Sequence, residues 1–245
     1  MTSFKELKAR ITDSFRFERK EILTLLAAVV LTAFVFSFSD WGEDSFNAVA
    51  GLKNLFLTLL VTSISLGVWI SFQKIYALSE GYRSNYKIWW PGFGISLLVA
   101  FISFGRFPLP LIGGTHTSFS SRQRLGEFRY GFSNYDNAVI CFFGIAANLF
   151  LAVLFSLGLH YSPDSYFFIK GLIFNLSMAF FSLLPLPKFN GLTIFFGSRM
   201  LYYISISLIL LFAVLLLSKT TIGLVISILA GLISALVFLL AYSEK

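Results

Sequence analysis

Long apolar runs separated by short polar segments dominate the chain from residue 22 onward. A helix that crosses a bilayer needs about 17 to 25 predominantly apolar residues. The runs predict an all-α polytopic membrane protein with six transmembrane helices, at residues 22–39, 52–78, 138–159, 168–184, 201–217 and 222–242. Neither a long internal repeat nor a separating linker is apparent, so residues 22–245 are predicted to form a single six-span membrane domain.

Residues 1–21 have a different pattern, because they are polar and mixed in charge. Phe4, Leu7, Ile11 and Phe15 recur near helical spacing. The segment is therefore predicted to be a cytoplasmic amphipathic helix on the membrane surface. Its basic side chains would face lipid headgroups: Lys5, Lys8, Arg10, Arg16, Arg19 and Lys20. A frayed polar tail is the alternative.

Residues 88–105 are apolar but contain Pro91, Gly92 and Gly94, which argue against a regular helix. They could form another span or a short membrane-embedded irregular or strand segment. Cytoplasmic loops carry an excess of Lys and Arg. If residues 88–105 do not cross, both termini are cytoplasmic, and so are the basic residues in the middle of the chain: Arg83, Lys87, Arg106, Arg122, Arg124 and Arg129. The six-span arrangement is therefore preferred.

The composition supports a membrane protein, with 57% hydrophobic and 13% charged residues, whereas soluble domains carry about 25% charge. The lipid bilayer is thus the first predicted partner. The net charge of +7 fits basic loops against anionic lipid, and no soluble basic domain or aromatic platform suggests a nucleic acid partner. Cys141 is the only cysteine, which excludes an internal disulfide, and one cysteine cannot build a metal site alone.

The apolar run near residue 184 is interrupted by the sequence SLLPLPKFNGL, residues Ser182–Leu192. Irregular backbone inside a membrane is tolerated only where protein or a water-filled cavity satisfies its hydrogen bonds. Pro185, Pro187, Asn190 and Gly191 therefore indicate either a buried site or a packing hinge.

Three motifs occur in the order typical of one family. They are LPLIGG at Leu109–Gly114, GIAANLF at Gly144–Phe150, and SLLPLPKFNGL. Together they resemble elements of the site-2-protease-like membrane proteins, the M50 peptidase group, over about residues 55–199. The resemblance implies a three-helix core that holds an intramembrane zinc protease site. It also implies a His-Glu-x-x-His motif on the second span and an aspartate in the later element.

The sequence departs from that pattern at each expected ligand. Phe72 and Tyr76 stand where histidines belong, Gln73 replaces the glutamate, and Asn190 replaces the aspartate. Phenylalanine has no donor atom, and the neutral amides are weak ligands that accept no proton at neutral pH. We therefore expect no catalytic residue, no zinc and no other cofactor. The retained framework would still shape a pocket: Gly144, Asn148, Pro185, Pro187 and Gly191.

Substitute ligands are scarce. His116 is expected in a loop, His160 at the opposite end of its span, and Cys141 away from both. Catalytic zinc needs three protein ligands, and these residues are not expected to converge. Lys74, near the cytoplasmic end of its helix, is expected to extend its ammonium toward water.

The leading hypothesis is an inactive member of that family, a pseudoprotease that binds, retains or scaffolds another membrane protein or its transmembrane segment. An active intramembrane metalloprotease with non-standard ligands is the second hypothesis. A transporter or channel subunit with a polar path along Gln73 and Lys74 is the third.

Overall fold

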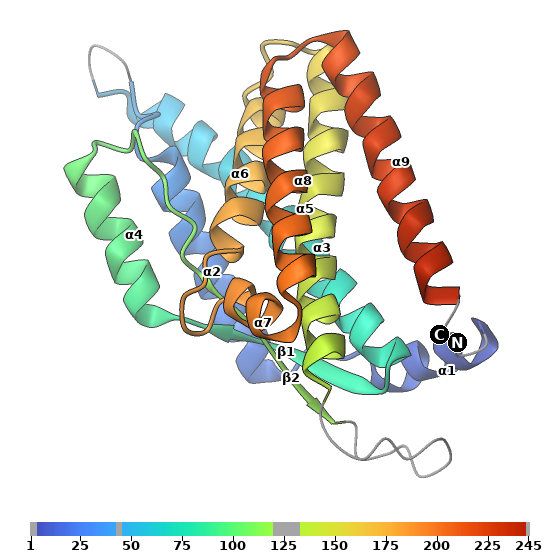
Figure 1. Cartoon of the computed structure of the whole chain (residues 1–245). Helices are drawn as coiled ribbons and strands as arrows, with labels where there is room; N and C mark the ends of the chain where they lie inside the picture. The colour runs from blue at the N-terminus through green and yellow to red at the C-terminus, as the bar shows by residue number, and fades with distance from the viewer. Residues whose placement is uncertain (1–3, 43–45, 120–132, 244–245) are drawn as a thin grey trace.

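The structure, a computed structural model, describes residues 4–42, 46–119 and 133–243, with the side chains of 4–6, 119 and 237–243 left out. It is a helical bundle with one small antiparallel sheet (Figure 1). The elements in chain order are α1 Phe4–Ser14, α2 Arg19–Ser37, α3 Ala48–Ser79, β1 Tyr82–Ile88, α4 Trp90–Ile102, β2 Gly113–Phe119, α5 Asn134–Tyr161, α6 Tyr166–Ser182, α7 Asn190–Gly197, α8 Arg199–Leu217 and α9 Thr221–Ser243.

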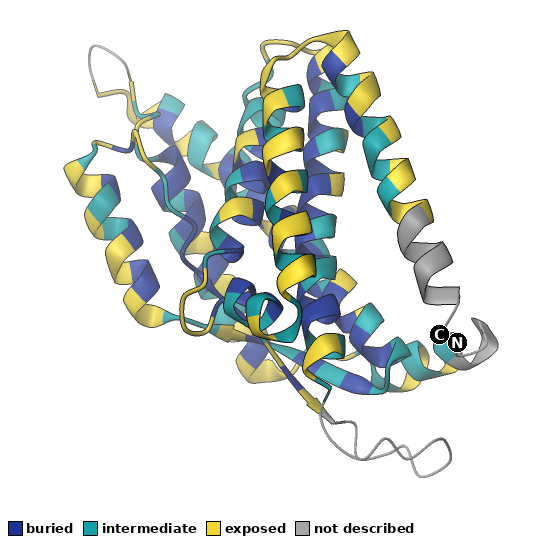
Figure 2. Ribbon diagram, in the orientation of Figure 1, coloured by how far each residue is buried: buried dark blue, intermediate teal, exposed yellow. Residues whose placement is uncertain are grey.

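Four helices, α2, α3, α5 and α8, are long and apolar enough to cross a membrane. Shorter apolar helices are α4, α6 and the stretch Thr221–Leu236 of α9. This composition fits an all-α integral membrane protein. Helix α5 is the most buried of the four candidate spans and packs against α3, α6, α7, α8 and α9. Figure 2 shows buried residues along α5, whereas the outward face of α8 is exposed.

Side chains outside the apolar runs fix where several helices begin. Asn47 accepts the backbone N–H groups of Val49 and Ala50 at the start of α3, each at 3.1 Å. Ser133 and Ser198 cap α5 and α8 in the same way. Such caps satisfy amide groups that have no partner within the helix, so the polar breaks determine the lengths of the apolar helices.

Most of residues 88–105 form the regular helix α4 and no embedded strand, so the predicted irregularity is wrong for them. Helix α4 begins at Trp90 with Pro91 in its first turn, where proline costs no hydrogen bond. Its thirteen residues give a length of about 20 Å, which is short for a span. The sheet forms on either side of this segment instead, from β1 and β2.

The chain returns from the end of α4 to β2 as extended backbone over residues 106–112. This return is buried where it meets β1, because Leu111 and Ile112 are nearly inaccessible. Tyr86 donates its phenolic O–H to the carbonyl of Ile112 at 2.7 Å, and Trp89 donates its backbone N–H to the same carbonyl at 3.1 Å. Burial raises the pKa of Tyr86 above its usual value, which keeps the donor protonated. Protein groups thus satisfy the irregular backbone.

The course of α4 and the return segment places Arg106 differently from what the charge distribution predicted. Gly105 packs on Ser39, and Phe38 meets Phe101 with ring centroids 4.8 Å apart. The end of α4 therefore lies beside the end of α2, far from β1. Arg106 lies at that end too, so the prediction that it groups with Arg83 and Lys87 is wrong. Arg122, Arg124 and Arg129 lie outside the described residues.

The sheet pairs Tyr82 with Phe119 and Ile88 with Gly113 in antiparallel register. His116 lies on β2 opposite Asn85, which corrects its predicted place in a loop. Alternate residues of a strand point to opposite faces. Accordingly, Thr115 is half-buried and His116 is exposed. The two-stranded sheet thus brings Thr115, and not the histidine, toward the helices.

Candidate functional site

Three polar side chains from different elements meet inside the bundle, and we call Gln73, Thr115 and Asn190 the amide cluster. Asn190 donates its Nδ2 group to Gln73 Oε1 at 3.3 Å. Thr115 donates its hydroxyl to Gln73 Oε1 and its backbone N–H to Asn190 Oδ1, the latter at 3.1 Å. Gln73 and Asn190 are almost fully buried. The cluster therefore joins α3, β2 and α7 through neutral hydrogen bonds.

The broken stretch Ser182–Leu192 positions Asn190 as the first residue of helix α7. Chain direction changes between α6 and α7, and the backbone at Lys188 has a positive φ of 69°. Gly191 lies against the backbone of Leu183 so closely that a Cβ atom would overlap the Leu183 carbonyl. The absence of a side chain thus lets α7 begin directly against the end of α6. Helix α7 was not predicted, because its eight residues begin inside the broken stretch, between the predicted spans 168–184 and 201–217.

Two further glycines allow close approach to the amide cluster. A Cβ atom on Gly144 of α5 would overlap the Gln73 amide, and it would lie 2.6 Å from Trp69 Nε1. A Cβ atom on Gly114 of β2 would lie 2.7 Å from Asn190 Oδ1. The motifs around Gly144 and Gly114 therefore meet at one place, although they are distant in sequence.

Cys141 also belongs to this region, whereas neither histidine does. It is fully buried one turn before Gly144 on α5. The hydroxyl groups of Thr115 and Thr193 lie within hydrogen-bonding reach of its thiol. Sequence reasoning missed Thr115, Thr193 and Trp69. For Trp69 a signal existed, because it lies four residues before Gln73 and shares its helix face.

Several buried polar atoms near the cluster lack a hydrogen-bond partner among the described residues. They are Gln73 Nε2, Trp69 Nε1, and both amide atoms of Asn148. Asn148 lies one turn beyond Gly144 and is fully buried. An unpaired buried donor or acceptor costs about 1–3 kcal/mol. The interior along α3 and α5 therefore retains unused hydrogen-bonding capacity.

The remaining predicted site residues lie elsewhere. Phe72 is exposed on the outer side of α3 and stacks on Phe150 at 6.3 Å between ring centroids. Tyr76 is half-buried and stacks on Phe143 at 4.0 Å. Pro185 and Pro187 are exposed in the turn before α7. The structure thus brings together Gln73, Asn190, Gly144 and Gly191, but neither Phe72 nor the two prolines.

The donor set of the amide cluster does not fit a catalytic zinc ion. Such an ion takes three strong ligands, drawn from imidazole, thiolate and carboxylate, and leaves a fourth position open. Cys141 supplies one thiol, while Gln73 and Asn190 supply neutral amides already bonded to each other. His116 and His160 are exposed on other faces. Within the described part of the chain, no three His, Cys, Asp or Glu side chains group as metal ligands.

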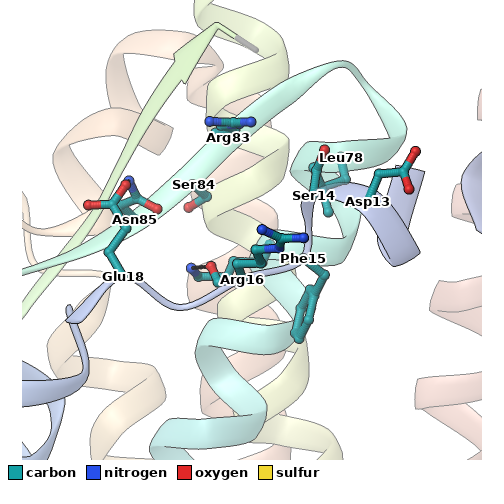
Figure 3. A pocket seen from close by; sticks show the side chains of 10 residues that line it. Asp13, Ser14, Phe15, Arg16, Glu18, Leu78, Arg83, Ser84 and Asn85 are labelled. Atoms are coloured by element: carbon teal, nitrogen blue, oxygen red, sulfur yellow. Dashed lines mark hydrogen bonds between the residues drawn. The ribbon is translucent and has the colours of Figure 1, made fainter. Parts of the chain in front are cut away.

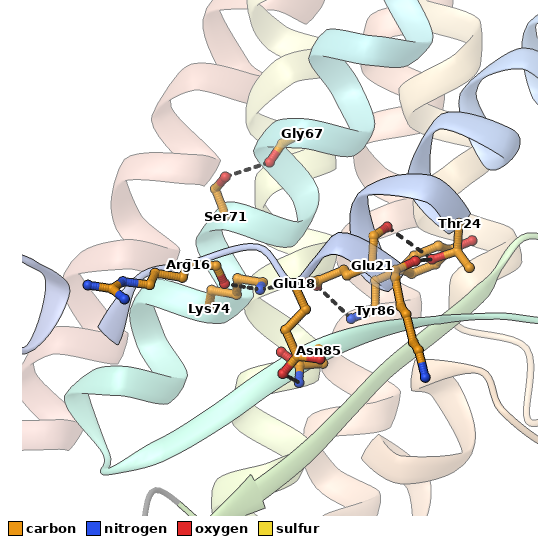
Figure 4. A network of polar contacts seen from close by, with 10 residues as sticks. Arg16, Glu18, Glu21, Thr24, Gly67, Ser71, Lys74, Asn85 and Tyr86 are labelled. Carbon is orange, nitrogen blue, oxygen red and sulfur yellow. Dashed lines mark hydrogen bonds and ion pairs between the residues drawn. The ribbon is translucent and has the colours of Figure 1, made fainter. Parts of the chain in front are cut away.

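Lys74, the residue after Gln73, belongs to a separate polar site, which Figure 4 shows. Lys74 Nζ lies 2.7 Å from Glu21 Oε2 and donates to the carbonyl of Arg16 at 3.0 Å. Glu21 Oε1 accepts the Tyr86 N–H at 2.9 Å. Both charged side chains are buried. The prediction that Lys74 extends to water is wrong, because α2 provides a buried carboxylate for it.

Comparisons with known proteins point to one class. The chain is 27% identical, over 185 residues, to "Putative zinc metalloprotease MJ0611" of Methanocaldococcus jannaschii, covering 72% of this chain and 84% of the archaeal protein. No family model and no solved structure matches the chain. The long apolar helices fit an integral membrane protein. Its sequence is distantly similar to a metalloprotease-like protein.

Proposed function

We propose that the protein is a pseudoprotease of the site-2-protease-like type, which binds another membrane protein without cleaving it. The observation that carries the proposal is the bond between Gln73 and Asn190. These two residues stand where the resemblance implies a general base and a metal ligand. In this chain they are neutral and hydrogen-bond to each other, so neither can take up a proton at neutral pH.

Unused polar atoms support a binding role. Gln73 Nε2 and Trp69 Nε1 are donors, and Asn148 offers both a donor and an acceptor, with no partner among the residues described. An unwound segment of a partner presents backbone carbonyl and N–H groups, which need such partners inside a membrane. Thr115 and Tyr76 are half-buried, and Tyr76 lies one turn of α3 beyond Gln73. A partner segment would first make contact at these two residues.

A photocrosslinking amino acid tests the partner. Placed at Tyr76 in the full chain and activated in native membranes, it should yield a defined crosslinked membrane protein. The matched control is the same substitution at Tyr203, an exposed tyrosine on α8 that is not part of the cluster. Identical products from both positions, or none from Tyr76, would count against the proposal.

An active enzyme with non-standard ligands is the second candidate, and hydrolysis is therefore tested separately. Cys141 is the residue to vary, because it lies next to Thr115 of the amide cluster. Protein purified without chelator should contain far less than one zinc per chain, and the Cys141→Ser variant should contain the same amount. Stoichiometric zinc that Cys141→Ser removes would overturn the pseudoprotease proposal. So would cleavage of a membrane substrate that Asn190→Leu abolishes.

A transport path along Gln73 and Lys74 has less support. Gln73 faces the amide cluster, whereas Lys74 pairs with Glu21. The two side chains therefore line no common path.

A further inference from the structure

A polar cavity of about 320 Å³ lies at the end of the bundle where α3 ends and α2 begins. The linker between α1 and α2 forms one wall, and β1 forms another (Figure 3). This cavity is distinct from the amide cluster, since it opens on the Lys74 side of α3. Its volume is in the range that holds small ligands.

Positive charge and an unused hydroxyl line the cavity. Arg16 comes from the linker, and Arg83 and Ser84 come from β1 (Figure 3). Among the described residues, Arg83 Nε and the Ser84 hydroxyl are buried without a hydrogen-bond partner. Lys74 also borders the cavity, but Glu21 neutralises it. Guanidinium groups and a hydroxyl are the donors that proteins use to bind phosphate.

Two carboxylates border the same cavity. Asp13 lies at the end of α1, and Glu18 in the linker accepts a long hydrogen bond of 3.4 Å from Asn85. The two guanidinium charges are therefore balanced by two carboxylate charges. A simple anion would be repelled by these carboxylates. A ligand that carries both a phosphate and an amine would satisfy both sets of groups.

The place of the cavity in the fold indicates where such a ligand would come from. The cavity lies at the terminal turn of α3, beside the amphipathic α1 and the start of the apolar α2. Phe15 and Leu78 add apolar surface to its lining. Ends of membrane-spanning helices lie at the depth of lipid headgroups. We propose that this cavity binds a phosphate-and-amine headgroup, that of an aminophospholipid such as phosphatidylethanolamine.

Native mass spectrometry of the delipidated full chain tests the proposal. The chain is mixed in turn with phosphatidylethanolamine, phosphatidylcholine, phosphatidylglycerol and free phosphoethanolamine. We expect one phosphatidylethanolamine per chain to be retained, and the other two lipids to be retained at least about tenfold more weakly. Retention of free phosphoethanolamine would support the same headgroup chemistry with a soluble source. Equal retention of phosphatidylglycerol would overturn the proposal.

Variants locate the binding. Arg83→Gln should weaken retention of phosphatidylethanolamine by about tenfold or more, because it removes a charge-assisted hydrogen bond. Lys87→Gln is the matched control, since Lys87 lies on the same strand, is exposed and does not line the cavity. If Arg83→Gln does not fold, Arg16→Gln on the exposed linker takes its place. Equal retention by the cavity variant and the Lys87→Gln control would overturn the assignment.

Discussion

Gln73 and Lys74 are neighbours on α3, yet they face two different polar regions. Lys74 belongs to a charged pair with Glu21, and its ammonium also donates to the Arg16 carbonyl. Gln73 belongs to the neutral amide cluster, where its Nε2 group lacks a partner among the described residues. A buried charge must be paired, because leaving it alone costs several kcal/mol. A neutral amide costs much less to leave without a hydrogen-bond partner, so the amide cluster can hold an unused donor, whereas the ion pair cannot.

The largest predicted effect comes from breaking the charged pair. Lys74→Met leaves the Glu21 carboxylate buried without its counter-ion, and should lower the free energy of unfolding by about 3–5 kcal/mol. Denaturation in mixed micelles measures it. The double variant Lys74→Met with Glu21→Leu should recover part of the loss, although Glu21 also accepts the Tyr86 N–H. If the two single effects simply add, the pair is not coupled.

The second effect concerns the backbone that supports the amide cluster. Gly191→Ala places a methyl group against the Leu183 carbonyl and should cost about 1–3 kcal/mol of unfolding free energy, as overpacking does. Gly94→Ala is the control, because nothing lies within 4 Å of its added carbon in α4. That variant should be neutral or slightly stabilising. An equal change in unfolding free energy for the two variants would show that α7 does not depend on close approach to α6.

A third prediction has the opposite sign. Asn148→Leu removes two buried amide atoms that have no partner in the described structure, and should raise the free energy of unfolding by about 1 kcal/mol. The same variant should weaken capture of a partner by the crosslinker at Tyr76. Asn175→Leu is the control, since Asn175 donates to Ser65 at 2.9 Å and to Gly171 at 2.8 Å. Its loss should destabilise. A destabilised Asn148→Leu would mean that its amide is satisfied in the protein.

The smallest effect is the coupling within the amide cluster. A double-mutant cycle with Gln73→Leu and Thr115→Val should give a coupling of about 0.6 kcal/mol, which is the average for side-chain hydrogen bonds in membranes. Pairing Gln73→Leu with Thr24→Val should give none, because Thr24 bonds only within α2. A Gln73–Thr115 coupling of several kcal/mol would show that the cluster is as stringent as the charged pair.

The sequence by itself determined the membrane class and the long apolar helices. Their signal is local, because an apolar run of sufficient length has few alternatives to a helix in lipid. The sequence also indicated that Gln73 and Asn190 matter, since both interrupt apolar surroundings. It misplaced residues 88–105, because Pro91 and Gly92 break helices in general. The first-turn position of Pro91 is compatible with a helix, and Gly92 allows the Leu111 carbonyl to pack closely against it.

Only the tertiary structure decided which side chains meet. Cys141, Thr115 and Thr193 are ordinary residues in their own segments. The crossing of α3, α5, α7 and β2 brings Thr115 to Gln73, and Thr115 and Thr193 to Cys141. Likewise, the positions of Lys74 and Glu21 lie far apart in the chain, and α2 must pack on α3 before either charge has a partner. Contacts between distant segments depend on packing geometry, which hydrophobic periodicity does not encode. For that reason the charged pair, the amide cluster and the cavity between the α1–α2 linker and β1 became visible only in the folded chain.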